Sequence, residues 1–156
     1  MTCTAPQRRS PPVAAERLFV DTAFLLAVFN QRDQYHQAAL RLSARVRKCR
    51  ELWTTDAVLL EIGAAFSAPA QRQIAVRIWD EFHTDPRCRL VEVSGPLLGR
   101  AMDLFRNRPD KAWSLADCAS FVLMGDHGLT DALTCDAHFV QAGLRALLLE
   151  EAEQTG

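Results

Sequence analysis

Short apolar runs alternate along the chain with longer segments in which apolar residues recur at helical spacing. The runs 18–20 and 52–54, the alternating segment 89–93 and the stretches 131–134 and 145–149 predict strands. Between them, the pattern predicts helices over 22–30, 34–48, 56–66, 69–85, 94–105 and 114–125. Strands that alternate with helices indicate an α/β domain whose central, mostly parallel sheet lies between helical layers.

Polar residues and one proline mark the starts of several predicted helices. We expect Asp56, Ser94 and Ser114 each to cap the helix that follows, because short polar side chains accept hydrogen bonds from free backbone N–H groups. Pro69 is expected to open the next helix, since its fixed φ suits a first helical turn.

The ends of the chain lack such periodic patterns. Residues 1–16, which include Arg8, Arg9 and several prolines, are expected to form a flexible N-terminal tail. The domain is therefore predicted to span 17–150, with a short C-terminal tail over 151–156.

Composition excludes several classes of protein. The 156 residues carry 18 basic and 19 acidic side chains, so no overall positive charge marks a nucleic-acid-binding protein. The five cysteines are widely spaced without a C-x-x-C pair, which argues against a zinc site or a disulfide framework and is typical of a reducing cytoplasm. No apolar run reaches transmembrane length. We therefore expect a cytoplasmic protein with no membrane partner.

Four carboxylates stand in otherwise apolar segments. They are Asp21, directly after the first predicted strand, Glu61 within VLLEIGAAF, Asp117 within the apolar helix, and Asp136 after the strand 131–134. Burying an ionised carboxylate is costly unless a partner compensates its charge. A shared divalent cation would compensate several at once, and Mg²⁺ prefers such oxygen ligands.

Each acid also has a purely structural explanation. Asp21 and Asp136 could each cap the helix that follows, and Asp117 stands three residues after Ser114, the spacing of a capping box. Glu61 lies too deep in its helix to cap it, although it could reach solvent or an arginine. The four acids together favour a metal site, where a bound ion activates a water and orients a phosphodiester.

The segments that carry these acids resemble the motifs of the PIN domain family. LFVDTAFLLAVFNQRDQYHQAA resembles its opening, VLLEIGAAF the segment of its second acid, and WSLADCASFVLM and ALTCDAHFVQAGL its third and fourth motifs. All four occur in order between about Leu18 and Leu149, nearly the whole chain. The resemblance is to single-domain PIN proteins of the VapC toxin type, and it implies a PIN-like three-layer α/β/α sandwich.

The resemblance also implies a function. Asp21, Glu61, Asp117 and Asp136 would be the catalytic acids that hold one or two Mg²⁺ or Mn²⁺ ions, and a metal-bound water would attack an RNA phosphodiester. The protein would then be a ribonuclease and the toxin of a type II toxin–antitoxin pair. PIN toxins of this type commonly form homodimers and are held inactive by an antitoxin peptide over the active-site groove.

Positions beside the acids refine this picture. Thr22 and Thr134 stand where such proteins often carry a polar residue near the site, and we expect them to support the acids. Ala116 stands where a hydroxyl residue is expected, and Ala23 where serine is common. Neither departure removes a carboxylate, so the resemblance still implies activity.

The remaining histidines, tryptophans and basic residues have structural interpretations beside the functional ones. We interpret His138 as structural, with a ligand or catalytic role as the alternative, and expect Trp53, Trp79 and Trp113 in the core rather than as base-stacking platforms. Basic residues could contact RNA phosphates or form ordinary solvated faces: Arg41, Arg45, Arg47, Lys48, Arg50, Arg106, Arg108 and Lys111.

Other functions are compatible with parts of the pattern. A non-catalytic RNA- or protein-binding PIN module is disfavoured because all four acids are present, whereas an RNA-processing PIN nuclease without an antitoxin would carry the same site. A phosphoacceptor regulatory domain also has an acidic Mg²⁺ pocket, but it carries adjacent acids after its first strand and a lysine late in the chain. Asp21 has no acidic neighbour and the last lysine is Lys111, so this class is rejected.

Overall fold

The central element of the structure is a sheet of five parallel strands in the order β3-β2-β1-β4-β5. The computed structural model describes residues 16–154, so all but the last residue of the tail expected over 1–16 lies outside them. The strands are β1 Arg17–Val20, β2 Glu51–Thr55, β3 Cys88–Val91, β4 Asp131–Leu133 and β5 Arg145–Ala146. The parallel sheet with helices on both sides confirms the predicted three-layer α/β/α fold class.

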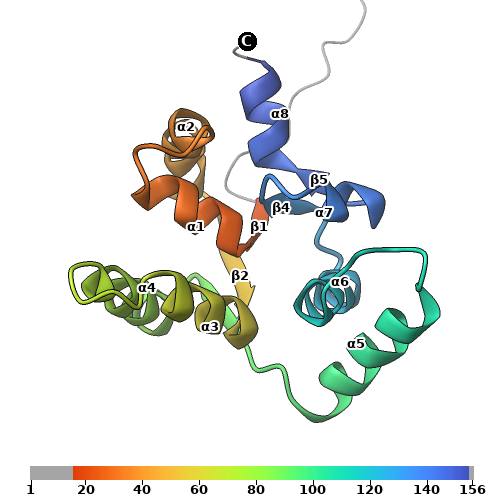
Figure 1. The fold of residues 1–156 in the computed structure, drawn as a ribbon. Helices are drawn as coiled ribbons and strands as arrows, with labels where there is room; N and C mark the ends of the chain where they lie inside the picture. Colours follow the sequence, from red (N-terminus) through yellow and green to blue (C-terminus); the bar gives the residue numbers. More distant parts are fainter. Residues whose placement is uncertain (1–15, 155–156) are drawn as a thin grey trace, which may run out of the picture.

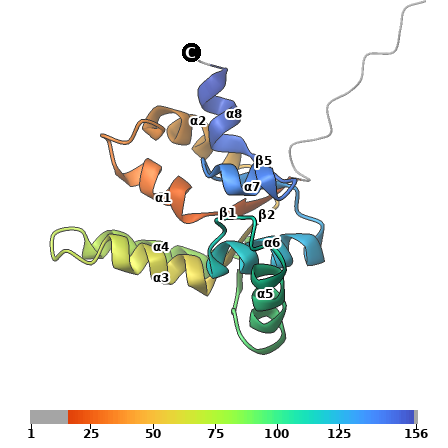
Figure 2. The same cartoon turned by 45° about the vertical axis from the view of Figure 1, so that its right-hand side comes forward.

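Helices connect the successive strands and cover the sheet (Figures 1 and 2). They are α1 Thr22–Phe29, α2 His36–Val46, α3 Asp56–Ala65, α4 Arg72–Thr84, α5 Gly95–Asn107, α6 Leu115–His127, α7 Ala137–Gln141 and α8 Leu147–Glu153. The helices α1 and α2 lie on one side of β1, and α5 and α6 pack against each other on the other side (Figure 1). Within residues 16–154, no helix is long and apolar enough to cross a membrane.

The chain reverses its direction across the sheet beside the central strand β1. From β1 it runs outward through β2 to β3, and α5 and α6 then carry it back to β4 on the other side of β1. The last residue of β1, Val20, therefore pairs with Leu133 at the end of β4. In open α/β sheets, ligands bind at such a reversal, beyond the carboxyl ends of the strands. A ligand site is therefore expected at the residues that follow Val20 and Leu133.

An aromatic cluster fixes the helices that border this reversal. Phe139 on α7 is fully buried and lies between Phe19 of β1 and Phe121 of α6, with ring centroids 6.1 and 5.0 Å apart respectively. Aromatic side chains bury more apolar area than most residues and dominate the energetics of a core. The cluster therefore holds α6 and α7 in fixed positions against the sheet edge.

The prediction of a strand over 145–149 is wrong beyond Ala146, where the chain turns into α8. Leu147 and Leu148 are buried in that helix, and the backbone N–H of Leu148 donates to the carbonyl of Thr134. A short apolar run fits a buried strand or a buried helix equally well, so the local pattern did not decide between them. The helix ends at Glu153, beyond the domain boundary expected at residue 150.

Three expectations about helix starts are also corrected. Ser94 occupies the N-cap position of α5, but its side chain accepts no capping hydrogen bond. Thr55, not Asp56, caps α3, because the Thr55 hydroxyl accepts a backbone N–H from the first turn of the helix. The Asp56 carboxylate instead accepts from the backbone N–H of Val93 at 2.9 Å. Pro69 lies in a turn, and α4 begins only at Arg72. The fixed φ of proline suits a turn as well as a first helical turn, so the residue alone does not locate the helix start.

The three tryptophans differ in burial. Trp113 is buried as expected, and Trp53 is half-buried against the core. Trp79 on α4 is 52% exposed, so its predicted core position is wrong. It stacks instead on His83, with ring centroids 4.2 Å apart. Trp79 follows Ile78, which is buried, and the turn of about 100° per helical residue directs the Trp79 ring away from the side that buries Ile78.

Candidate active site

Asp21 directly follows β1 at the carboxyl edge of the sheet. Its backbone N–H donates to the carbonyl of Leu133 at 3.3 Å, which joins the end of β1 to the end of β4. Its Oδ2 accepts from the hydroxyl of Thr134 at 2.7 Å. Although Asp21 occupies the N-cap position of α1, its side chain makes no capping hydrogen bond. Capping therefore does not explain this carboxylate, which is directed toward the residues after β4.

The surroundings of Asp21 disfavour its negative charge. Removal from water is the largest cause and raises the pKa of Asp21 to about 6, and the charges of Asp117 and Glu61 add to the rise. The Thr134 hydroxyl and the backbone of Thr22 oppose it by hydrogen bonding to the carboxylate. A carboxylate that is costly to ionise beside two further acids is an arrangement that a bound cation stabilises.

Thr134 joins two of the predicted acids. It is fully buried, and its Oγ1 donates to Asp21 while accepting from the backbone N–H of Asp136 at 3.0 Å. Asp136 in turn caps α7, since its Oδ1 accepts from the backbone N–H of His138 at 2.8 Å. One hydroxyl thus sets the positions of Asp21 and Asp136 relative to each other, as a supporting residue would.

Asp117 lies in the first turn of α6 and forms the capping box that its spacing predicts. Its backbone N–H donates to the Ser114 hydroxyl at 3.0 Å, and its Oδ2 accepts from the backbone N–H of Ser114 at 2.8 Å. Its Oδ1 makes no hydrogen bond with any residue of 16–154. Ser114 thereby supplies polar support that Ala116 cannot, and the cap leaves one carboxylate oxygen available to a ligand.

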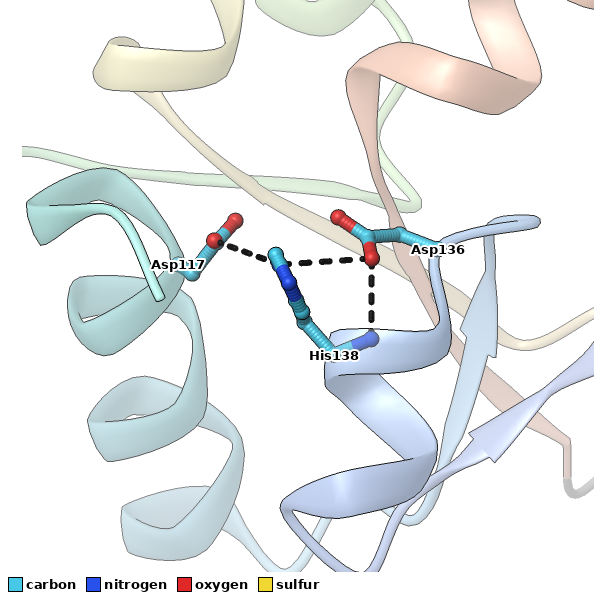
Figure 3. A group of neighbouring side chains, drawn as sticks. All are labelled: Asp117, Asp136 and His138. Atoms are coloured by element: carbon cyan, nitrogen blue, oxygen red, sulfur yellow. Dashed lines mark hydrogen bonds and ion pairs between the residues drawn. The ribbon is translucent and has the colours of Figure 1, made fainter. Parts of the chain in front are cut away.

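Three side chains converge between α6 and α7, as Figure 3 shows. The Nδ1 of His138 lies 3.3 Å from Asp117 Oδ2 and 3.4 Å from Asp136 Oδ1. One ligand atom of each residue lies within 4.8 Å of the other two, close enough to share a metal ion. This Nδ1 is buried from solvent, yet it makes a hydrogen bond with neither carboxylate nor any other described residue. A purely structural role for His138 leaves that nitrogen unexplained.

Glu61 stands apart from this compact group. It is exposed on α3, and its Oε2 accepts from the hydroxyl of Thr22 at 2.6 Å. Because Thr22 directly follows Asp21, this hydrogen bond draws Glu61 toward the sheet edge. Asp21 experiences the charges of both Glu61 and Asp117, and so it connects the two parts of the acidic site.

Several of the basic residues considered for RNA contacts are held elsewhere. Arg45 on α2 pairs with Glu16 and, at 3.5 Å, with Asp131, the first residue of β4. Arg45 therefore lies at the amino edge of the sheet, opposite the acids. The guanidinium of Arg108 pairs with Asp110 at 2.9 Å and lies over the ring of Trp113, in the loop that leads into α6 and Asp117. Among the basic segments considered, this loop is the one that directly precedes the helix carrying Asp117.

The chain resembles known proteins in sequence and in fold. The family model described as PIN domain matches residues 18–144. None of the curated proteins compared with the chain matches it. Among solved structures, the crystal structure of VapC20 from Mycobacterium tuberculosis, a sarcin–ricin loop cleaving toxin, is similar, with a TM-score of 0.72 and 26% identity over 82% of this chain and 96% of that chain. With its motifs, sheet and family match in agreement, the chain belongs to the PIN domain family.

Proposed function

We propose that the protein is a metal-dependent endoribonuclease that hydrolyses RNA phosphodiester bonds and acts as the toxin of a type II toxin–antitoxin pair. The observation that carries the proposal is the convergence of carboxylates where the strand order of this PIN domain reverses. Capping accounts for one oxygen each of Asp117 and Asp136. It accounts neither for the direction of Asp21 nor for the unbonded Nδ1 of His138.

The residues present fit a divalent cation. Asp117 Oδ1 and Asp136 Oδ2 make no hydrogen bond with the part of the chain that the structure describes, so each carboxylate keeps an oxygen for an ion. Carboxylate oxygens are the ligands that Mg²⁺ and Mn²⁺ prefer. We propose that Asp21, Glu61, Asp117 and Asp136 together hold one or two such ions. A bound ion would supply an activated water and would stabilise the charge that develops on the phosphate.

The chain's own residues orient these acids in advance. Thr134 holds Asp21 on one side, and the backbone N–H of Ser114 holds Asp117 on the other. Thr22 restrains Glu61 in the same way. Each partner binds one oxygen of its carboxylate. The orientation of the other oxygen is therefore already set before an ion binds. Such preorganised groups stabilise developing charge more effectively than mobile ones do.

The basic loop before α6 is the proposed contact for RNA. Arg108 is fixed over Trp113, and Lys111 is part of the same loop, a few residues before Asp117. Cations in this loop would bind RNA phosphates in exchange for their ion pairs with Asp110. Such contacts position the RNA but do not read its sequence.

An apolar groove supports an antitoxin partner. The groove encloses about 310 Å³ between α1, α2 and α4, and its lining includes Phe24, Phe29, Ile78 and Phe82. Phe29 is 38% exposed there, although large apolar side chains are usually buried. Since α1 begins directly after Asp21, a peptide in this groove would extend toward the acids. We propose that an antitoxin segment with apolar side chains binds here, and that the toxin is a homodimer in solution.

The test is cleavage of a pool of single-stranded RNAs, including one with a sarcin–ricin stem-loop, with Mg²⁺ or Mn²⁺. Asp21→Asn and Asp117→Asn should each lower the rate about 100-fold or more, because each removes a charged ligand from the site. Asp103→Asn, on the exposed face of α5, is the matched control and should leave cleavage unchanged. Circular dichroism shows whether each variant is folded.

Three results would redirect the proposal. Cleavage that persists in EDTA, or in both site variants, would contradict a metal-dependent site at these acids. A protein that binds metal but cuts no RNA in the pool would favour the non-catalytic binding module. Metal-dependent cleavage by a protein that no antitoxin inhibits would favour an RNA-processing nuclease.

A further inference from the structure

We propose that His138 is a nitrogen ligand of the metal ion in this site, and that it makes the site select Mn²⁺ and other transition-metal ions over Mg²⁺. The inference rests on the proposed function, since it concerns the ion that the function requires. It is carried by the position of His138 Nδ1 between Asp117 and Asp136 (Figure 3).

The buried nitrogen has no hydrogen-bonding partner of its own. An imidazole nitrogen either carries a proton and needs an acceptor, or carries a lone pair and needs a donor or a cation. Nδ1 lies within 3.4 Å of both carboxylates without forming a hydrogen bond to either, and no other described residue supplies a partner. A neutral nitrogen would direct its lone pair at two negative groups. A shared cation would satisfy the nitrogen and both carboxylates together.

The spacing of the three groups suits one small ion. Neighbouring ligand atoms around an octahedral ion with bonds of about 2.1 Å lie about 3 Å apart. Nδ1 lies 3.3 Å from Asp117 Oδ2 and 3.4 Å from Asp136 Oδ1. Because these two oxygens already accept backbone N–H groups, the ion would bind the other oxygens, Asp117 Oδ1 and Asp136 Oδ2, and small side-chain adjustments would bring them and Nδ1 onto one ion.

The backbone holds the imidazole in this position. His138 is the second residue of α7, and its N–H donates to Asp136 Oδ1, so the cap that orients Asp136 also orients His138. The next residue, Phe139, is fully buried against Phe19 and Phe121 and fixes the orientation of the short helix about its axis. A ligand that is already in place loses little conformational entropy when the ion binds.

A nitrogen ligand changes which ion the site prefers. Mg²⁺ takes oxygen ligands and gives up its waters reluctantly, whereas neutral imidazole is the commonest nitrogen ligand of transition-metal ions. A site made of Asp21, Asp117 and Asp136 alone would offer oxygen only. With His138 included, transition-metal ions gain a ligand that Mg²⁺ does not favour.

The same geometry allows a competing role with the opposite consequence. A protonated His138 would be a positive charge that holds the two carboxylates together in place of a metal ion. Its removal would then tighten the binding of any divalent cation, because a competing positive charge would be lost. The sign of the change in affinity therefore separates a ligand from a stand-in cation.

The experiment measures Mn²⁺ binding to the full-length protein by electron paramagnetic resonance, with spin-echo detection of nitrogen coupled to the ion. His138→Ala and His138→Gln are compared with wild type, and His83→Ala on α4 is the matched control. Wild type and the control should show imidazole nitrogen coupling that both His138 variants lose. The dissociation constant for Mn²⁺ should rise about tenfold or more in those variants, as it does when residues that support a metal site are lost. The dissociation constant for Mg²⁺, measured by calorimetry, should change much less.

Wild-type protein that binds Mn²⁺ without nitrogen coupling, or coupling that survives both substitutions, would overturn the inference. So would Mn²⁺ affinity that stays the same or increases in folded variants. The glutamine variant preserves most of the side-chain volume and guards against loss of folding as an explanation. Nitrogen coupling in a protein that cuts no RNA would refute the proposed function alone. Metal-dependent cleavage without nitrogen coupling would refute this inference alone.

Discussion

Replacing Asp21 with asparagine should stabilise the metal-free protein at neutral pH, although it removes a proposed catalytic acid. Asparagine keeps an oxygen that can accept from the Thr134 hydroxyl, while the negative charge beside Asp117 and Glu61 is lost. The folded state disfavours that charge, mainly because the carboxylate is removed from water. The substitution should therefore relieve a destabilising interaction that a bound metal ion would otherwise compensate.

The raised pKa sets both the size and the pH range of the effect. The pKa of Asp21 rises from 3.8 to about 6 on folding. At about 1.4 kcal/mol per pKa unit, this corresponds to about 3 kcal/mol between the neutral and charged forms. Because the folded pKa is the higher one, the favourable contribution is complete below the unfolded pKa of 3.8 and is lost as the pH rises through 6. The variant should thus gain little at acid pH and up to about 3 kcal/mol above neutrality.

The assay is urea unfolding of metal-free wild type and Asp21→Asn in EDTA, across a pH series from acid to neutral. The difference between the two free energies of unfolding reports mainly on Asp21, because only Asp117 and Glu61 interact with its charge and other groups titrate alike in both proteins. Asp103→Asn is the control, since its exposed ion pair with Arg106 should contribute little at any pH. With saturating Mn²⁺ the sign should reverse, because wild type then gains binding energy that the variant lacks.

Two outcomes would refute the reasoning about Asp21. One is a free-energy difference that does not change with pH, which would mean that the Asp21 carboxylate titrates alike in the folded and unfolded states. The other is a variant less stable than wild type at neutral pH in EDTA, which would mean that the charge of Asp21 stabilises the metal-free fold.

Three further substitutions test the residues that hold the acids and the helix α7 in position. Thr134→Val keeps the buried shape but leaves the Asp136 N–H without its acceptor, so urea unfolding should show a loss of about 1–3 kcal/mol and calorimetry about tenfold weaker metal binding. Ser114→Ala removes the cap hydroxyl and should cost about 1 kcal/mol in urea, yet cleavage should be reduced only modestly because Asp117 still accepts a backbone N–H. Phe139→Ala should cost about 3–5 kcal/mol in the same unfolding assay, since its ring is fully buried between two others.

The sequence predicted the sheet and the location of the acids because both follow from local patterns. A buried parallel strand appears as a short apolar run, and an acid at its carboxyl end interrupts that run, as Asp21 does after β1. The capping box of Ser114 and Asp117 is equally local, since both partners lie within one helical turn. The supporting roles of Thr22 and Thr134 were inferred from the family resemblance. In the structure, each hydroxyl donates a hydrogen bond to one of the acids.

Features that depend on distant contacts were not predictable in this way. The run 145–149 became a two-residue strand followed by α8 because buried leucines suit either element and only tertiary packing decides. Arg45 was one of the basic residues considered for RNA contacts, but it pairs with Asp131, which lies far away in the sequence. The position of His138 against Asp117 likewise depends on how α6 and α7 pack, which no local spacing encodes.

Anomalous diffraction from crystals grown or soaked with Mn²⁺ tests most directly whether the acids form one metal site. A peak bonded to Asp117 and Asp136, on the side of the site that faces Asp21, is the expected result. A crystal that binds Mn²⁺ only at other residues, or a peak at this edge that no carboxylate approaches, would contradict the account.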